Sequence, residues 1–197
     1  MIEKTICGVR VNTLEQWDNL LWHDEAIIGK YWSWAIHPGD VCIDAGFGPG
    51  GWTLVALAKG ASVFAFDPKP QAIQILTELL AVNDFRDRCT IIPAGLRDKA
   101  GQLLFEGQWY SAVSLDDFAD EKKLKRLDHI NMDVEGFELE VVQGGRKTIR
   151  RFRPRMIVEV HDGALWDALE GELKSLGDYA FGRLGDFLIA IPRGTPA

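Results

Sequence analysis

The sequence predicts an α/β domain with a mostly parallel sheet, because short apolar runs alternate with helical stretches along most of its 197 residues. Buried strands separated by helices pair in parallel through right-handed crossovers, so we expect helices on both faces of the sheet. The length fits one domain, with residues 1–38 as an N-terminal helical cap and residues 39–197 as the core.

Seven strands are expected in this sheet. The five parallel strands are predicted at residues 41–43, 62–66, 89–92, 129–132 and 156–160. The helices between and after them are predicted at residues 53–58, about 69–82, 135–151 and 165–176. Residues 95–118 look like an extended excursion in place of a crossover helix. Residues 179–181 and 187–191 read as a final hairpin, which adds an antiparallel C-terminal strand.

The N-terminal cap is expected to be helical. The segment 13–16 reads Thr-Leu-Glu-Gln, which has the form of a capping box, so we expect a helix through Trp22 and a second one from about Asp24 to Ile36. Trp34 lies off the apolar face of the second helix and is expected to line a pocket. The residues that share this apolar face are Ile27, Ile28, Tyr31, Trp32 and Ala35.

Composition argues against several classes of partner. Lys and Arg total 22 against 29 Asp and Glu, and a net charge of −7 repels a phosphate backbone, so nucleic acid is an unfavoured partner. The three cysteines lie far apart and form no CxxC pair, which indicates reduced thiols in a cytoplasmic protein. No apolar run approaches the roughly 18 residues that a bilayer requires, so we expect no membrane association.

A glycine-rich loop follows the first strand and opens the first helix. Residues 44–51 read Asp-Ala-Gly-Phe-Gly-Pro-Gly-Gly, and glycine lets the backbone N–H groups of such a loop approach a ligand closely. Asp67 ends the second strand 21 residues after Gly46. That offset is typical of an acidic residue that binds ribose hydroxyls, so the two features predict a nucleoside-bearing cofactor.

The loop chemistry favours S-adenosylmethionine over NAD. A pyrophosphate gains nothing from a neighbouring carboxylate, whereas Asp44 places negative charge where a sulfonium and an amino group would lie. A purely structural capping role for Asp44 is the alternative. We expect Gly46, Gly48 and Asp67 to hold the cofactor and Pro68 to lie against the adenine. The full set of expected cofactor contacts is Asp44, Gly46, Phe47, Gly48, Asp67, Pro68 and Ala94.

Acidic residues also follow the fourth and fifth strands. Asp133, Glu135 and Glu138 come after the fourth strand, and Glu159 and His161 end the fifth. Helix capping explains each carboxylate taken singly, and a lone histidine is usually a surface residue. Because ligands bind beyond the carboxyl ends of parallel strands, their convergence on one edge points to a site.

These motifs together resemble those of the FkbM-type S-adenosylmethionine-dependent methyltransferases, over about residues 38–161. The resemblance implies a class I methyltransferase (Rossmann-like) fold and methylation of hydroxyl groups, often on sugars or natural products. Two positions differ from the family pattern: Asn131 stands where the family usually has Lys, and the glycine loop lacks its usual Gly-Ala-Asn-x-Gly form. The segments that carry the resemblance are residues 44–51, Phe66-Asp67-Pro68, Ser114-Leu115-Asp116-Asp117-Phe118, Asp133-Val134-Glu135-Gly136-Phe137-Glu138, Gly144-Gly145, Arg153-Pro154-Arg155 and Glu159-Val160-His161.

We therefore expect an S-adenosylmethionine-dependent O-methyltransferase that acts on a hydroxyl of a small molecule, sugar or natural product. Asp133, Glu135 and His161 are the candidates for acceptor binding and proton removal, with their individual roles open. Asp133, Glu159 and His161 also offer ligands for Mg²⁺, although a metal-free site is the favoured expectation.

Three alternatives remain at this stage. An RNA 2′-O-methyltransferase would need a basic track, and the basic clusters at residues 122–126 and 150–153 are explained more simply as solvated helix faces. A non-catalytic nucleotide-binding module would bind the cofactor without consuming it. A short dehydrogenase would bind NADH instead.

Overall fold

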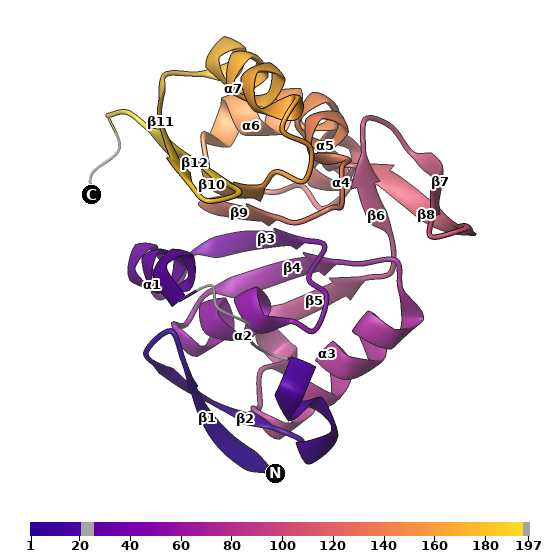
Figure 1. Ribbon diagram of the computed structural model, residues 1–197, viewed down its shortest axis with the longest axis vertical. Helices are drawn as coiled ribbons and strands as arrows, with labels where there is room; N and C mark the ends of the chain where they lie inside the picture. Colours follow the sequence, from indigo (N-terminus) through magenta and orange to yellow (C-terminus); the bar gives the residue numbers. More distant parts are fainter. Residues whose placement is uncertain (21–25, 195–197) are drawn as a thin grey trace.

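The centre of the fold is a seven-stranded sheet with the strand order β11-β12-β10-β9-β3-β4-β5 (Figure 1). The computed structural model describes residues 1–20 and 26–194. All neighbouring strands pair in parallel except β12, which is antiparallel to both β10 and β11. This confirms the predicted sheet and its antiparallel C-terminal strand. The strands are β3 (Val41–Ala45), β4 (Ser62–Phe66), β5 (Cys89–Ile92), β9 (His129–Met132), β10 (Arg155–Glu159), β11 (Tyr179–Leu184) and β12 (Phe187–Pro192).

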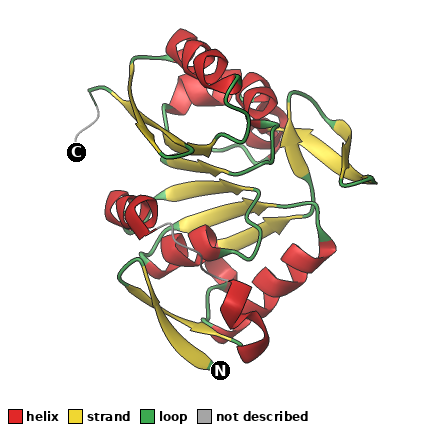
Figure 2. Ribbon diagram, in the orientation of Figure 1, coloured by secondary structure: helices red, strands yellow, loops and turns green. Residues whose placement is uncertain are grey.

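Helices cover both faces of the sheet, as Figure 2 shows. Alternation along a strand sends successive side chains to opposite faces, so Ile43 packs toward one group of helices and Cys42 toward the other. The first face carries α4 (Leu115–Glu121), α5 (Glu138–Gly144), α6 (Arg146–Phe152) and α7 (Leu165–Leu176). The second face carries α1 (Ala26–Ala35), α2 (Gly51–Ala58) and α3 (Pro70–Val82).

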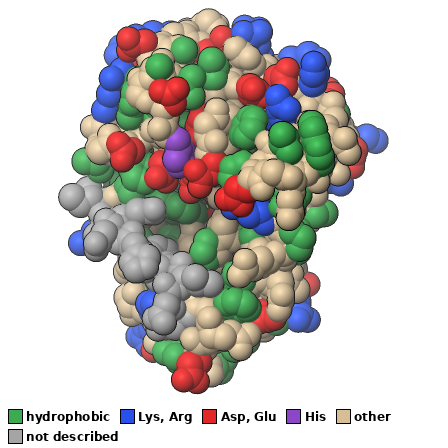
Figure 3. Space-filling model, turned by 45° about the vertical axis from the view of Figure 1, so that its right-hand side comes forward, with side chains coloured by type: hydrophobic (Ala, Val, Ile, Leu, Met, Phe, Trp, Pro, Cys, Tyr) green, Lys and Arg blue, Asp and Glu red, His purple; other side chains and the backbone are tan. Residues whose placement is uncertain are grey.

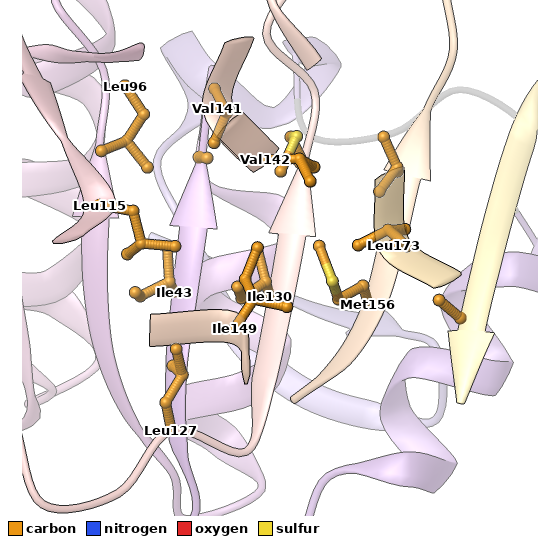
Figure 4. Close-up of a cluster of buried hydrophobic side chains, with 14 of the residues drawn as sticks. Ile43, Leu96, Leu115, Leu127, Ile130, Val141, Val142, Ile149, Met156 and Leu173 are labelled. Carbon is orange, nitrogen blue, oxygen red and sulfur yellow. The ribbon is translucent and has the colours of Figure 1, made fainter. Parts of the chain in front are cut away.

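The larger core cluster lies between the sheet and the helices α4 to α7. Figure 4 shows Ile43, Ile130 and Met156 from three neighbouring strands directed toward Ile149 and Leu173 of the covering helices. These side chains are at most 1% exposed, so they hold the strand ends at fixed positions.

The N-terminal cap begins as a hairpin, and the prediction of a helical segment over residues 1–38 is wrong for its first part. The hairpin consists of β1 (Ile2–Ile6) and β2 (Val9–Thr13). The amide of Asn12 donates to the side chain of Asn83 at 2.6 Å, which fixes β2 to the end of α3. Tertiary packing against α2 and α3 stabilises these short strands, which are marginal by themselves.

The predicted capping box does not form. The Thr13 hydroxyl donates to the carbonyl of Leu14 at 3.4 Å, and a 3₁₀ helix, η1 (Glu15–Leu20), follows instead of an α-helix. In α1, Ile28, Trp32 and Ala35 are buried as expected. Trp34 is 70% exposed to solvent and does not line the pocket described below. Trp22, Asp24 and the side chain of Ile27 lie outside the described part of the chain.

The excursion after β5 is a separate three-stranded sheet with the order β6-β8-β7. Its strands are β6 (Gly95–Arg97), β7 (Gly101–Phe105) and β8 (Gln108–Ser114). Glu106 and Gly107 form a two-residue turn between β7 and β8, and both have left-handed φ angles of 49° and 77°. The extended character was predicted correctly, but the segment ends at Ser114, whose hydroxyl caps α4.

The helix predicted over residues 135–151 is divided in two. Glu135 and Gly136 have φ angles of 53° and 96°, which α-helical residues do not adopt, so α5 begins only at Glu138. Gly145 then separates α5 from α6. The divided helix leaves the loop after β9 free to line the carboxyl edge of the sheet. A short 3₁₀ helix, η2 (Arg86–Arg88), precedes β5.

Candidate active site

A pocket opens at the carboxyl ends of β3, β4 and β9. Its walls are the glycine loop after β3, the end of β4, the start of β6, the inner face of the β7–β8 hairpin and the loop after β9. The predicted site residues that line it are Gly46, Gly48, Asp67, Pro68, Asp133 and Glu135. The pocket therefore brings residues of both predicted clusters together.

The glycine loop packs directly against the loop after β9. Gly46 has a φ of +79°, and its amide donates to the carbonyl of Phe66 at 2.8 Å. A Cβ atom at position 46 would overlap the carbonyl oxygen of Asp133. Glycine is therefore required here both for its backbone angle and for the close approach of two loops.

Asp67 holds the glycine loop against the end of β4. Its Oδ2 accepts a hydrogen bond of 3.0 Å from the amide of Gly48, and its Oδ1 accepts one of 2.8 Å from the amide of Lys69. Burial raises the pKa of Asp67 above its usual value, and these two backbone bonds oppose the rise. Each carboxylate oxygen has a second lone pair, so the side chain can also accept bonds from a ligand in the pocket.

Asp44 lies beneath the loop instead of lining the pocket. Its carboxylate is 1% exposed and accepts a 2.6 Å bond from the hydroxyl of Thr53 and a 2.9 Å bond from the side-chain amide of Asn131. Burial raises the pKa of Asp44 to about 6. Asp44 thus ties β3 to α2 and β9. This is a structural role, which was the alternative to a contact with the cofactor.

The side chains of Phe47 and Ala94 are also directed away from the pocket. Phe47 is 2% exposed and packs in the core beneath α2 and α3, while Ala94 is 5% exposed. The next residues after Ala94, Gly95 and Leu96, do line the pocket. Only the backbone of Phe47 belongs to the glycine loop.

Sequence reasoning missed the contribution of the β7–β8 hairpin. Leu103 and Phe105 from β7 line the pocket opposite Pro68, and the Lys69 ammonium lies 4.7 Å from the centre of the Phe105 ring. The alternating apolar pattern of residues 101–105 was the available signal. It indicated a strand but not which surface that strand would cover.

The acidic residues gather around His161 at the rim of the pocket. Nε2 of His161 lies 3.5 Å from Asp133 Oδ1, 3.5 Å from Glu135 Oε2 and 3.9 Å from Glu159 Oε1. Figure 3 shows acidic side chains around a histidine beside a hollow in this face. The predicted convergence of the ends of β9 and β10 is therefore present.

Glu138 is a further member of this group, and it is fully buried. Its Oε1 accepts a 3.1 Å bond from Nδ1–H of His161 and a 2.9 Å bond from the amide of Gly136. Sequence reasoning explained Glu138 as a helix cap, and the structure instead places its carboxylate behind the imidazole. No signal in the sequence distinguished a helix-capping Glu138 from a Glu138 that is buried behind His161.

The environment shifts the protonation of this group. Burial and then the charge of Glu159 raise the pKa of Asp133 to about 7. Burial lowers the pKa of His161, but the bond to Glu138 and the charges of Asp133 and Glu135 outweigh it and raise the pKa. Asp133 can therefore exchange a proton near neutral pH.

Comparison with known proteins decides the family. The model of the methyltransferase FkbM domain family matches residues 43–180, which is more than half of the chain. The chain belongs to this family. The matched residues include the glycine loop, Asp67 and the acidic group around His161, so the FkbM domain contains the whole candidate site.

Two solved structures show that the FkbM domain has the class I methyltransferase fold. A methyltransferase FkbM from Methylobacillus flagellatus KT is 20% identical with a TM-score of 0.64, over 82% of this chain and 50% of that one. The fibrillarin of Aeropyrum pernix, solved with bound S-adenosyl-L-methionine, is 10% identical with a TM-score of 0.53, over 79% of this chain and 67% of that one.

Among curated proteins, the hexuronic acid methyltransferase AglP of Haloferax volcanii is 30% identical to the FkbM domain over 142 residues. The aligned segment is 63% of this chain and 57% of AglP. A ribosomal RNA small subunit methyltransferase H from a Caulobacter species is 36% identical over 84 residues, which are 41% of this chain and 26% of that protein. The FkbM domain thus matches little more than half the length of AglP and about a quarter of the RNA enzyme. Within residues 1–20 and 26–194, no helix has the length and apolarity needed to cross a membrane.

Proposed function

We propose that this FkbM domain is an S-adenosylmethionine-dependent O-methyltransferase that acts on a hydroxyl group of a small molecule or glycan. One observation carries the proposal: Asp133 and Glu135 line the pocket beside the glycine loop and Asp67, and they also belong to the acidic group around His161. A hydroxyl held at this rim would lie between the pocket and side chains able to take its proton. Bound S-adenosylmethionine would supply an electrophilic methyl group on a sulfonium.

The pocket residues fit this cofactor. Asp67 offers carboxylate oxygens to ribose hydroxyls. The space beside Gly48 is open, since a Cβ atom built there meets no atom within 4 Å, so a ligand can approach its backbone. Pro68, Leu96 and Phe105 provide an apolar slot for a purine ring. Asp133 adds a carboxylate to the same wall, which favours a positively charged ligand.

The rim residues provide the acid–base chemistry of the proposal. A hydroxyl has a pKa far above neutrality, so its proton must pass to a nearby base as the new bond forms. Asp133, with a pKa of about 7, has the basicity suited to this transfer at neutral pH. Glu135 and His161 would hold the acceptor against it.

Sugars are the acceptor class with the best support. The similarity to a hexuronic acid methyltransferase extends over 142 residues, against 84 for the ribosomal RNA enzyme. The acidic rim also disfavours a nucleic acid, because its many phosphates are repelled by carboxylates, and by the same repulsion it favours a neutral sugar over a free hexuronic acid.

The test measures methyl transfer from radiolabelled S-adenosylmethionine to a panel of hydroxylated acceptors that includes hexuronic acids, neutral sugars and RNA. We expect transfer to a sugar, and loss of about 100-fold or more of the turnover in Asp133→Asn with affinity for S-adenosylhomocysteine kept within a few-fold. Asp167→Asn is the matched control, since this carboxylate is 98% exposed on α7. Joint loss of cofactor affinity and turnover would instead assign Asp133 to the cofactor site.

An RNA acceptor is the second candidate, favoured by the similarity to the ribosomal RNA enzyme. It predicts RNA binding that weakens steeply with salt. Cofactor binding without transfer to any acceptor class would contradict both candidates and favour a non-catalytic module.

A further inference from the structure

The imidazole of His161 is oriented by a carboxylate from behind. Glu138 is fully buried, and in the neutral imidazole the bond that its Oε1 accepts from Nδ1–H leaves the lone pair of His161 on Nε2. Histidines that bind metal ions almost always donate their other N–H to such a carboxylate or carbonyl. Nε2 is therefore presented as a ligand atom toward the rim of the pocket.

The distances at Nε2 do not fit hydrogen bonding. The carboxylate oxygens of Asp133 and Glu159 lie 3.5 Å and 3.9 Å from this nitrogen, beyond the 2.7–3.2 Å of protein N–H···O bonds. Ligand atoms around an ion with bonds of about 2.1 Å are separated by about 3.0–3.5 Å at angles of 90° to 110°. The three ligand atoms lie within 4.8 Å of one another, so a small inward movement of the carboxylates would bring them to these separations.

An oxygen without a partner faces the same space. Oδ1 of Asp133 is inaccessible to solvent and accepts no hydrogen bond, although a buried carboxylate oxygen ordinarily does. This is the oxygen that lies 3.5 Å from Nε2 of His161. A cation would satisfy it where no donor in the described part of the chain does.

The charges point in the same direction. In the described part of the chain, the ion-pair contacts of Asp133, Glu135 and Glu159 all go to His161. One imidazole cannot neutralise three carboxylates and the buried Glu138, so the group has an excess of negative charge. A divalent cation would reduce this repulsion.

We propose that Asp133, Glu159 and His161 form a binding site for a divalent cation, with Glu138 as the positioning residue of His161. Two carboxylates and one imidazole suit a first-row ion such as Mn²⁺, which accepts both oxygen and nitrogen ligands, better than Ca²⁺, which prefers oxygen alone. The site rests on the proposed function for its role: the ion would bind the acceptor hydroxyl and make its proton easier to remove. With the ion bound, Asp133 would be a ligand, and the proton would pass to Glu135, which also lines the pocket.

The experiment uses the purified chain and measures free Mn²⁺ by electron paramagnetic resonance during a titration, without cofactor or acceptor. We expect saturation at one ion per chain and competition by Zn²⁺. His161→Ala and Glu159→Gln should weaken binding by about 10-fold or more, because each removes a ligand. Asp167→Asn is the charge-matched control and should bind Mn²⁺ as the wild type does.

Glu138→Leu tests the positioning role. Leucine has a similar volume and removes the acceptor of the Nδ1–H bond, so the orientation and tautomer of the imidazole are no longer fixed. We expect Mn²⁺ binding to weaken by about 10-fold or more while the thermal unfolding midpoint shows that the variant is folded. Should this variant not fold, nitrogen-15 spectra of the wild-type imidazoles replace it: Zn²⁺ should shift Nε2 of His161 and leave its Nδ1 protonated.

Absence of saturable Mn²⁺ binding by the wild type would overturn the proposal, as would equal binding by His161→Ala. Affinity for S-adenosylhomocysteine is measured on the same samples. Cofactor binding without Mn²⁺ binding would reject the cation site and leave the proposed function standing, and the reverse result would reject the function alone.

Discussion

The amide of Gly48 donates a 3.0 Å hydrogen bond to Oδ2 of Asp67, and this bond joins the glycine loop to the end of β4. The residue proposed to bind ribose therefore also shapes the loop that would surround the cofactor. One carboxylate would therefore both position the glycine loop and bind the ligand.

Asp67→Ala should weaken binding of S-adenosylhomocysteine by at least about 10-fold, since hydrogen bonds to charged groups are worth about 1.5–3 kcal/mol each. Isothermal titration calorimetry measures the change. Asp120→Ala, which removes an exposed carboxylate on α4, should bind as the wild type does. Wild-type affinity in Asp67→Ala, or tight NADH binding by the wild type, would reject the cofactor assignment.

Gly46→Ala should lower the free energy of unfolding by about 2 kcal/mol or more, because a left-handed backbone strains alanine and its Cβ would overlap the Asp133 carbonyl. Urea unfolding measures the loss, and cofactor binding should fall with it. The control is Gly171→Ala on the exposed side of α7, where a Cβ meets no atom within 4 Å. That variant should gain about 0.5–1 kcal/mol, since alanine favours helices. Equal stability of the two variants would contradict the close approach of the loops.

Phe105→Ala should weaken binding of S-adenosylhomocysteine by about 10-fold, because it removes one wall of the apolar slot and the ring beneath the Lys69 ammonium. Leu104→Ala is the control from the same strand: Leu104 is 51% exposed and does not line the pocket. Calorimetry compares the two variants. A larger loss in Leu104→Ala would mean that the hairpin is not oriented as described.

The burial of Asp44 predicts a pH dependence of stability. Its pKa rises from 3.8 in the unfolded chain to about 6 in the fold, so the folded state binds the proton more tightly. The stabilisation from protonated Asp44 is complete below pH 3.8 and is lost as the pH rises through about 6, a change of about 3 kcal/mol. The Asp44→Asn variant has no titrating group at this position, so its stability does not show this pH-dependent loss.

Urea unfolding of both proteins between pH 4 and pH 7 provides the test. The stability of wild type relative to Asp44→Asn should fall as the pH increases, because other titrating groups cancel in the difference. Parallel curves for the two proteins would show that Asp44 keeps an ordinary pKa in the fold.

The sequence predicted the central sheet because its signals are local. The strands at residues 62–66, 89–92 and 129–132 and the helix at residues 165–176 have the predicted bounds, since continuous apolar runs and one strong helical period identify them. The ends of β9 and β10 also follow from parallel pairing, so the meeting of Asp133 and His161 was predictable.

The remaining features depend on contacts distant in the sequence. The β1–β2 hairpin is stabilised where Asn12 meets Asn83, and residues 1–13 contain no signal of that partner. The burial of Glu138 behind His161 depends on the left-handed turn at Glu135 and Gly136, which a helical reading of the segment conceals. The sequence predicted that Asp44 contacts the cofactor, whereas the structure buries it beneath the glycine loop. Packing alone determines how far a residue lies from the pocket surface, and the sequence pattern does not show it.

The turn of Glu106 and Gly107 fixes the register of the β7–β8 hairpin and thereby determines which side chains of β7 line the pocket. Two-residue turns of this kind fix which residues of a hairpin face each other, and here they pair Phe105 with Gln108. A shift of one residue would exchange the two faces of β7 and turn Leu104 inward in place of Phe105. The shape of the proposed purine slot is therefore set at the far tip of a hairpin that belongs to neither the seven-stranded sheet nor the glycine loop.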